Sequence, residues 1–155
     1  FGGFGQQGYG YNVSNLTGEI KRIMGIDRKH TIIIVGAGNI GHALTNFPGF
    51  AETGFEIKAL FDVNEDLIGT EIKGHPVLDV KDMDEYIREN QIDIGVIAAR
   101  RSAAQEIADR MCAAGIRGIW NFVPRDITTS VPIENVHLSE SLSTLSYKIE
   151  HGLLD

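Results

Sequence analysis

Three glycines form the clearest chemical pattern in this sequence. Gly36, Gly38 and Gly41 make a complete G-x-G-x-x-G motif, which directly follows the apolar run 32–35. In such a motif the first glycine permits a tight turn, the second lets the backbone approach a pyrophosphate, and the third lets the next helix pack closely on a sheet. The unpaired N–H groups at the start of that helix face the phosphates. The motif predicts a phosphate cradle made of Gly36, Ala37, Gly38, Asn39, Ile40 and Gly41.

Asp62 adds a second chemical group at the expected spacing. It ends the apolar segment 55–61 and lies about 20 residues after Gly41, where dinucleotide-binding domains place the carboxylate that holds an adenosine ribose. A structural turn that binds nothing is the alternative, because glycine-rich turns are common. The helix, strand and carboxylate that follow the motif in order favour a dinucleotide site.

The residues that other chemistries would need are missing from the sequence. The five histidines are scattered without metal-ligand spacing, and Cys112 is the only cysteine, so we expect neither a metal site nor a disulfide framework. The glycine motif lacks the Lys-Ser/Thr pair of a P-loop, which argues against nucleotide hydrolysis. A substrate domain would find no room after the dinucleotide unit. We therefore expect binding without turnover, and no catalytic residue.

The elements around the motif predict an α/β fold with a doubly wound parallel sheet. Short apolar segments bounded by turn residues are typical of buried strands, and here they alternate with helical patterns, as in a Rossmann fold. Pro76 suggests that the third strand lies at the sheet edge. The expected strand order is 3-2-1-4-5-6. The expected strands are 32–35, 55–61, 76–80, 93–98, 116–122 and 135–136.

Helices are expected between these strands, each with one apolar face. The first carries Ile40, Ala43, Leu44 and Phe47. The second is marked by Met83, Tyr86 and Ile87. The third is capped by Ser102 and buries Ala104, Ile107, Ala108, Met111 and Cys112. Cys112 is therefore expected to be a core residue and not a nucleophile.

Two further amphipathic helices flank the predicted sheet. One is capped by Asn12 and ends at Gly25, and it is more than a Rossmann unit requires. The other carries an apolar stripe of Leu138, Leu142, Leu145 and Ile149. This stripe can fold back on its own domain or pack against another subunit, and composition leaves both possibilities open.

Composition narrows the class of protein. The 155 residues are 43% hydrophobic, which suits one domain with a substantial core. The net charge of −7 gives no basic surface for nucleic acid over the whole chain. No apolar run approaches a membrane span, no leader is visible, and a single cysteine suits a reducing cytosol.

The order of several motifs resembles one protein family. The segments that carry the resemblance are GYNV at 10–13, VGAGNIGHAL at 35–44, NFPGF at 46–50, FDV at 61–63, SAAQEIADRMCAAGIRGIWNF at 102–122 and LSTLSY at 142–147. In this order they resemble the Rex family of bacterial redox-sensing transcriptional repressors. The similarity covers essentially the whole chain and is far more specific than the glycine motif alone.

The resemblance implies a cytoplasmic homodimer that is neither an enzyme nor a membrane protein. A Rossmann domain would sense the ratio of NADH to NAD⁺, and NADH binding would release operator DNA from an N-terminal winged-helix domain that precedes this sequence. Residues 1–29 would then be a hinge loop and connecting helix, 30–136 the NAD(H)-binding domain, and 137–155 a helix exchanged between the two subunits.

The resemblance also implies a wider set of cofactor contacts, at the ends of the second, fourth and fifth strands. Beyond the phosphate cradle and Asp62, these contacts are Val63, Ala98, Ala99, Arg100, Asn121, Phe122, Val123 and Pro124.

Three positions depart from the residues usual in the family. Phe47 stands where Tyr is common, His137 stands where Asp is common, and 98–100 read Ala-Ala-Arg where Thr-Val-Pro is frequent. Tyr and Asp could form a hydrogen bond that Phe47 cannot make, so the paired change suggests that Phe47 and His137 face each other across the subunit boundary. Alternatively, His137 simply starts the last helix. With Leu138, Phe47 would form an apolar pocket that accepts the uncharged nicotinamide of NADH more readily than the charged ring of NAD⁺.

Two other functions stay open at this point. One is a small NAD-dependent oxidoreductase or its cofactor-binding half, which would need an acid–base residue near Arg100 or Phe122. The other is a nucleotide-gated regulatory domain of a transporter, which would associate with membrane proteins.

Overall fold

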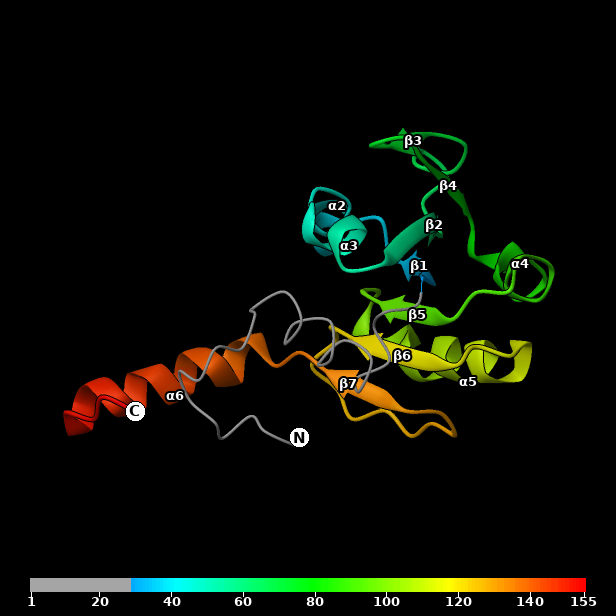
Figure 1. The fold of residues 1–155 in the computed structure, drawn as a ribbon. Helices are drawn as coiled ribbons and strands as arrows, with labels where there is room; N and C mark the ends of the chain where they lie inside the picture. The colour runs from blue at the N-terminus through cyan, green and yellow to red at the C-terminus, as the bar shows by residue number, and fades with distance from the viewer. Residues whose placement is uncertain (1–28) are drawn as a thin grey trace, which may run out of the picture.

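The computed structural model of the chain describes residues 29–155 (Figure 1). The glycine-rich opening and the helix expected after Asn12 lie outside the described residues.

A seven-stranded sheet runs through the described part of the chain, in the order β3-β4-β2-β1-β5-β6-β7. Its strands are β1 (His30–Val35), β2 (Phe55–Asp62), β3 (Glu71–Ile72), β4 (His75–Asp79), β5 (Ile94–Ile97), β6 (Gly118–Asn121) and β7 (Ile133–Asn135). All neighbouring pairs are parallel except β3 and β4, which are antiparallel. The expected order 3-2-1-4-5-6 is therefore confirmed for the six parallel strands.

Helices cover both faces of the sheet (Figure 1). They are α2 (Asn39–Thr45), α3 (Gly49–Glu52), α4 (Met83–Asn90), α5 (Ala104–Ala114) and α6 (Leu138–His151), with single 3₁₀ turns at η1 (Val80–Asp82) and η2 (Arg101–Ala103). Alternate side chains of β1 enter two separate cores, because successive residues of a strand point to opposite faces. Ile33 packs with Met83 of α4 and Met111 of α5, whereas Ile34 packs on the opposite face, against which Leu44 of α2 also packs. Burial on both faces explains the unbroken apolar run before the glycine motif.

The expectation that the third parallel strand forms the sheet edge is wrong. The short strand β3 pairs outside it, with Glu71 opposite Pro76 and Ile72 opposite His75. Lys73 and Gly74 connect the two strands, and both have positive φ, 52° and 83°, as a two-residue hairpin turn requires. Burial of Ile72 holds this added strand on the sheet.

Two expectations about the helices are wrong, one about the extent of α2 and one about the cap of α5. The glycine-motif helix α2 ends at Thr45, so Phe47 lies beyond it and is exposed, and Ala43 is exposed as well. The residue that α2 buries is Gly41, because the backbone itself packs on the glycine loop. Ser102 does not cap α5, which begins at Ala104 after a 3₁₀ turn that already uses the Ala103 amide in a bond to the Arg100 carbonyl oxygen.

The buried face of α5 otherwise agrees with the prediction. Ala104, Ile107, Ala108 and Met111 are buried, while Cys112 is only partly buried. The Cys112 thiol packs against the core and lies 3.4 Å from the Thr129 hydroxyl oxygen.

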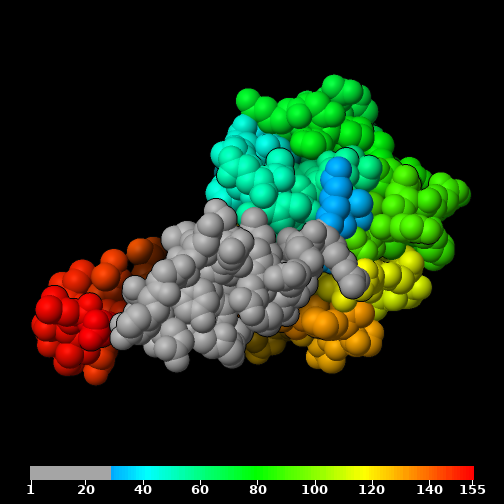
Figure 2. All heavy atoms as spheres, viewed as in Figure 1, coloured from blue at the N-terminus to red at the C-terminus, as the bar shows by residue number. Residues whose placement is uncertain are grey.

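The C-terminal helix α6 extends away from the sheet (Figures 1 and 2). None of its residues is buried, and its four stripe residues are each between 53% and 70% exposed: Leu138, Leu142, Leu145 and Ile149. The stripe therefore does not fold back on the described part of its own domain.

Residues 29–155 contain neither a membrane-spanning helix nor a metal-binding cluster. None of the helices there has both the length and the apolar character that a bilayer crossing requires. No group of three or more His, Cys, Asp or Glu side chains there could hold a metal ion.

Candidate functional site

The glycine loop lies at the carboxyl end of β1, between β2 and β5. Gly36 has a φ of 112°, and its amide donates to the Phe61 carbonyl oxygen at 2.7 Å. A Cβ on Gly36 would overlap the Ala98 carbonyl oxygen, and one on Gly41 would overlap the Gly36 carbonyl oxygen. Both positions therefore require glycine to let β1, β5 and α2 approach each other.

Gly38 has different surroundings. It precedes α2 with a φ of −82°, which other residues also adopt, and no atom lies within 4 Å of a Cβ placed on it. The space beside Gly38 is therefore open at the end of α2 whose first N–H groups lack intrahelical partners. These are the steric and electrostatic requirements of a pyrophosphate, so the loop fits this part of a dinucleotide.

The carboxylate of Asp62 is held in one orientation by three backbone amides. The Ala37 amide donates to Oδ2 at 2.7 Å, while the Val63 and Asn64 amides donate to Oδ1 at 2.7 and 2.9 Å. A carboxylate has about four acceptor positions, so Asp62 can still accept a hydrogen bond from a ribose hydroxyl. The same contacts tie the end of β2 to the glycine loop.

A cavity of about 740 Å³ brings these groups together. It opens at the carboxyl ends of β1, β2 and β5, where the strand order reverses and open α/β sheets bind ligands. Seven of the expected cofactor contacts line it: Gly36, Gly38, Asp62, Val63, Ala98, Ala99 and Arg100.

A second cavity, of about 520 Å³, adjoins α2 at Ile40. Apolar and charged groups share its lining. Expected contacts in it are Ile40, Phe122, Pro124, His137 and Leu138, and its charged residues include Arg101, Arg125, Asp126 and Glu140. The start of α6 thus lies beside the glycine-motif helix.

Asn121, the last residue of β6, is hydrogen-bonded to Val123 in the loop that follows the strand. The Asn121 side chain is 1% exposed, donates to the Val123 carbonyl oxygen at 3.0 Å, and accepts from the Val123 amide at 2.9 Å. It also donates to Asn135 Oδ1 at 2.9 Å. Its hydrogen bonds therefore fix the loop that carries Phe122 and Pro124.

Phe47 lies apart from both of these cavities. It lines a third one, of about 810 Å³, whose lining also includes residues of α3, the start of β2 and the turn between β3 and β4, and its ring packs edge-on against Phe50 with centroids 4.9 Å apart. Within one chain the structure does not bring Phe47 to His137 or Leu138.

Arg101 and Arg125, two cationic residues of the second cavity, were not among the expected contacts. Arg125 donates through Nη1 to the Arg101 carbonyl oxygen at 2.8 Å, which links the segments that follow β5 and β6. Their signal in the sequence is an arginine shortly after each of two neighbouring parallel strands, at the edge where ligands bind.

Comparison with known proteins gives one consistent set of relatives. A family model described as a CoA binding domain matches residues 27–125. The redox-sensing transcriptional repressor Rex of Clostridioides difficile is 51% identical over 154 residues, which cover 98% of this chain and 73% of the relative. Rex of Clostridium beijerinckii is 49% identical over 98% of this chain and 73% of the relative. Rex of Thermoanaerobacter sp. is 46% identical over 96% of this chain and 67% of the relative.

Solved structures agree with these relatives. RSP, a Rex-family repressor, has been solved with β-NADH, with 43% identity and a TM-score of 0.87 over 93% of this chain and 71% of RSP. RSP with β-NAD⁺ and operator DNA is 46% identical with a TM-score of 0.89 over 98% of this chain and 71% of RSP. UDP-D-quinovosamine 4-dehydrogenase from Vibrio fischeri, at 16% identity and a TM-score of 0.55, shares 76% of this chain and 86% of its own chain, and shows the fold alone.

Proposed function

Because this chain belongs to the Rex family of redox-sensing transcriptional repressors, we propose that its Rossmann domain binds NADH and NAD⁺ and that NADH binding releases operator DNA. The close relatives are repressors and not enzymes, so the oxidoreductase alternative is not retained. The observation that carries the proposal is the pairing of open space at Gly38 with the oriented carboxylate of Asp62.

The two cavities divide the proposed contacts between the halves of the cofactor. Gly38 and the start of α2 would hold the pyrophosphate, and Asp62 with Val63 would hold the adenosine. Ile40, Phe122 and Pro124 would contact the nicotinamide half, whose ring is charged in NAD⁺ and uncharged in NADH. Ala98, Ala99 and Arg100 line the first cavity beside the glycine loop and complete the set.

The contacts with operator DNA would come from a winged-helix domain on the N-terminal side of β1. The net charge of −7 supports this division, because phosphate neutralisation by basic residues supplies most non-specific affinity for DNA. In this proposal residues 1–29 connect the two domains, 30–136 bind the cofactor, and the protein works in the cytoplasm.

The second subunit would pack on α6. The exposed stripe of α6 supports this, since reciprocal exchange of one helix in a two-fold dimer buries the same surface twice. Phe47 and His137 lie apart within one chain, so a contact between them would be made across the dimer. The alternative for His137, a place at the start of α6, also agrees with its position beside Leu138.

Titration calorimetry with NADH and NADPH tests the assignment of Asp62. NADH is expected to bind at least about tenfold more tightly, because the 2′-phosphate of NADPH would lie against the Asp62 carboxylate. Asp62→Ala should narrow this preference, whereas the control Asp66→Ala, on the exposed turn after β2, should preserve it. Equal affinities for the two cofactors in the unaltered chain would refute the assignment.

A further inference from the structure

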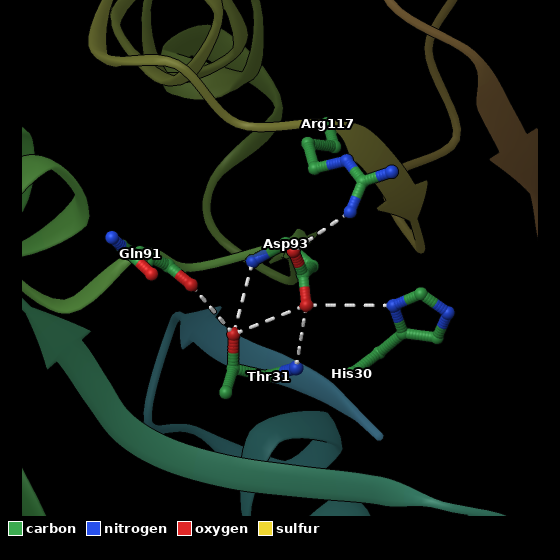
Figure 3. Close-up of polar contacts among 5 residues, drawn as sticks. All are labelled: His30, Thr31, Gln91, Asp93 and Arg117. Atoms are coloured by element: carbon green, nitrogen blue, oxygen red, sulfur yellow. Dashed lines mark hydrogen bonds and ion pairs between the residues drawn. The ribbon is translucent and has the colours of Figure 1, made fainter. Parts of the chain in front are cut away.

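Asp93 lies at the end of β1 opposite the glycine loop, where the chain enters the Rossmann domain. Figure 3 shows its carboxylate between groups from separate segments. Oδ2 accepts from the Thr31 amide at 3.1 Å and lies 3.4 Å from His30 Nδ1, while Oδ1 accepts from Arg117 Nη1 at 3.3 Å. We refer to His30, Thr31, Asp93 and Arg117 as the β1 clasp.

Backbone hydrogen bonds reinforce the β1 clasp. The Asp93 amide donates to the Thr31 carbonyl oxygen at 3.1 Å, and the Asp93 carbonyl oxygen accepts from the Arg117 amide at 2.8 Å. The Thr31 hydroxyl donates to the Gln91 carbonyl oxygen at 3.0 Å. The clasp thus joins the start of β1 to the segments that precede β5 and β6.

The charge of Asp93 suits these partners. Burial by itself raises the pKa of Asp93, but hydrogen bonds from the Thr31 amide, His30 and Arg117 outweigh it and hold the pKa below its usual value. The side chain is 20% exposed, so its ion pairs are partly shielded from water. The donors are therefore arranged around a carboxylate anion.

Sheet formation alone does not require this arrangement. β1 is paired along its length with β2, whereas its pairing with β5 covers only the residues from Ile32 to Val35, and the side chain of Asp93 lies outside both buried clusters. What the clasp adds is a side-chain attachment for the first two residues of β1. Those residues are the first of β1, directly after the segment that precedes the domain.

We propose that Asp93 is a positioning residue, whose carboxylate fixes how the chain enters β1 and thereby where the preceding DNA-binding domain lies. This inference rests on the proposed function, which places that domain on the N-terminal side of β1. A dimeric repressor must present two DNA-binding domains at the spacing of two half-sites, so freedom at this point lowers operator affinity. The cofactor cavity lies at the other end of the strands, so NADH affinity does not depend on the clasp.

The test uses the full-length repressor that contains this chain. Asp93→Asn replaces one acceptor oxygen by a donor and removes the charge. Operator affinity without NADH, measured by fluorescence anisotropy, is expected to fall about tenfold. NADH affinity, measured by calorimetry, is expected to stay within about twofold. Asp93→Glu, which keeps the carboxylate, should restore most of the operator affinity.

Asp84→Asn is the matched control. Asp84 pairs with Arg110 at 2.9 Å between α4 and α5, away from the β1 clasp, so its replacement should leave both affinities unchanged. If Asp93→Asn does not fold, Arg117→Gln provides the same test, because Arg117 is 68% exposed and pairs with Oδ1 of Asp93. Its expected loss of operator affinity is smaller, about threefold.

Unchanged operator affinity in the Asp93 and Arg117 variants would overturn the proposal. A parallel loss of operator and NADH affinities would also overturn it, since that pattern indicates general damage to the fold. If NADH did not change the operator affinity of the unaltered repressor, the proposed function would be contradicted. The role of Asp93 would still be decided by whether Asp93→Asn lowers operator affinity while NADH affinity stays unchanged.

Discussion

Gly36, Gly38 and Gly41 belong to one motif but have different surroundings, and these surroundings show which glycines folding requires and which one ligand binding requires. Gly36 and Gly41 face backbone oxygens that leave no room for a Cβ, whereas Gly38 faces open space. Side chains at the first two positions would strain the fold. At Gly38 a side chain would instead occupy the space that the pyrophosphate needs.

Gly38→Ala should therefore weaken NADH binding without unfolding the domain. We expect its melting temperature to match that of the unaltered chain and its NADH affinity to fall at least about tenfold. The matched variant Gly41→Ala should lose about 1–3 kcal/mol of stability or more, because overpacking forces the backbone apart. Thermal unfolding and calorimetry measure both effects, and tight NADH binding by Gly38→Ala would contradict the assigned cradle.

Asp93 gives a prediction about acid stability. Its pKa is lower in the folded chain, so its carboxylate stabilises the fold above the unfolded pKa of about 3.9, and this contribution is lost as the pH falls through the folded value. The free energy of unfolding should decrease as the pH is lowered below about 4, and the free energy of unfolding of Asp93→Asn should decrease less over the same range. Urea denaturation at several pH values measures this, and identical pH slopes for the two proteins would argue against it.

Residues close in sequence were predictable, whereas partners distant in sequence were not. The glycine motif and Asp62 follow a fixed spacing, so their place at the ends of β1 and β2 could be inferred. The contacts of Asp93 with Thr31, and of Asn121 with Asn135, depend on which strands become neighbours in the sheet. Nothing in the local composition of either residue signals such a partner.

Among the elements, α6 extends away from the sheet, and none of its residues is buried (Figure 1). The spacing of its leucines predicted the helix but left its packing partner open. In the structure the stripe stays exposed, which favours a partner subunit. The strand β3 is the opposite case, because two residues carry no periodicity and its pairing depends on the hairpin turn and on burial of Ile72.

Truncation after Ser139 tests the role of α6. It removes Leu142, Leu145 and Ile149, and burial of each such side chain contributes roughly 1.5–3 kcal/mol before ordering costs. Light scattering should then report monomers, and calorimetry should report a smaller difference between NADH and NAD⁺ affinities. Truncation after His151 keeps the helix and should change neither property. A dimer with unchanged preference after the longer truncation would show that α6 plays no part in either.

At the scale of the whole molecule, the two ends of the parallel strands have different roles. One end carries the cavities and the start of α6, and the other carries the β1 clasp. The carboxyl edge of the sheet carries the two cavities proposed for the cofactor, and α6 begins there, so Leu138 and His137 line the cavity next to Ile40. Its amino edge carries the β1 clasp, where the chain enters from the proposed DNA-binding domain. In the proposed mechanism, cofactor binding would act directly on α6, and through it on a second subunit, while the clasp would hold the domain that must leave the operator.

The most direct test of this account is operator binding by the full-length repressor at varied ratios of NADH to NAD⁺. Labelled operator DNA is followed by fluorescence anisotropy while NADH is added against a constant excess of NAD⁺, with Gly38→Ala as the matched variant. NADH is expected to release the DNA from the unaltered repressor and not from Gly38→Ala. Operator affinity that is the same with and without NADH in the unaltered repressor would contradict it.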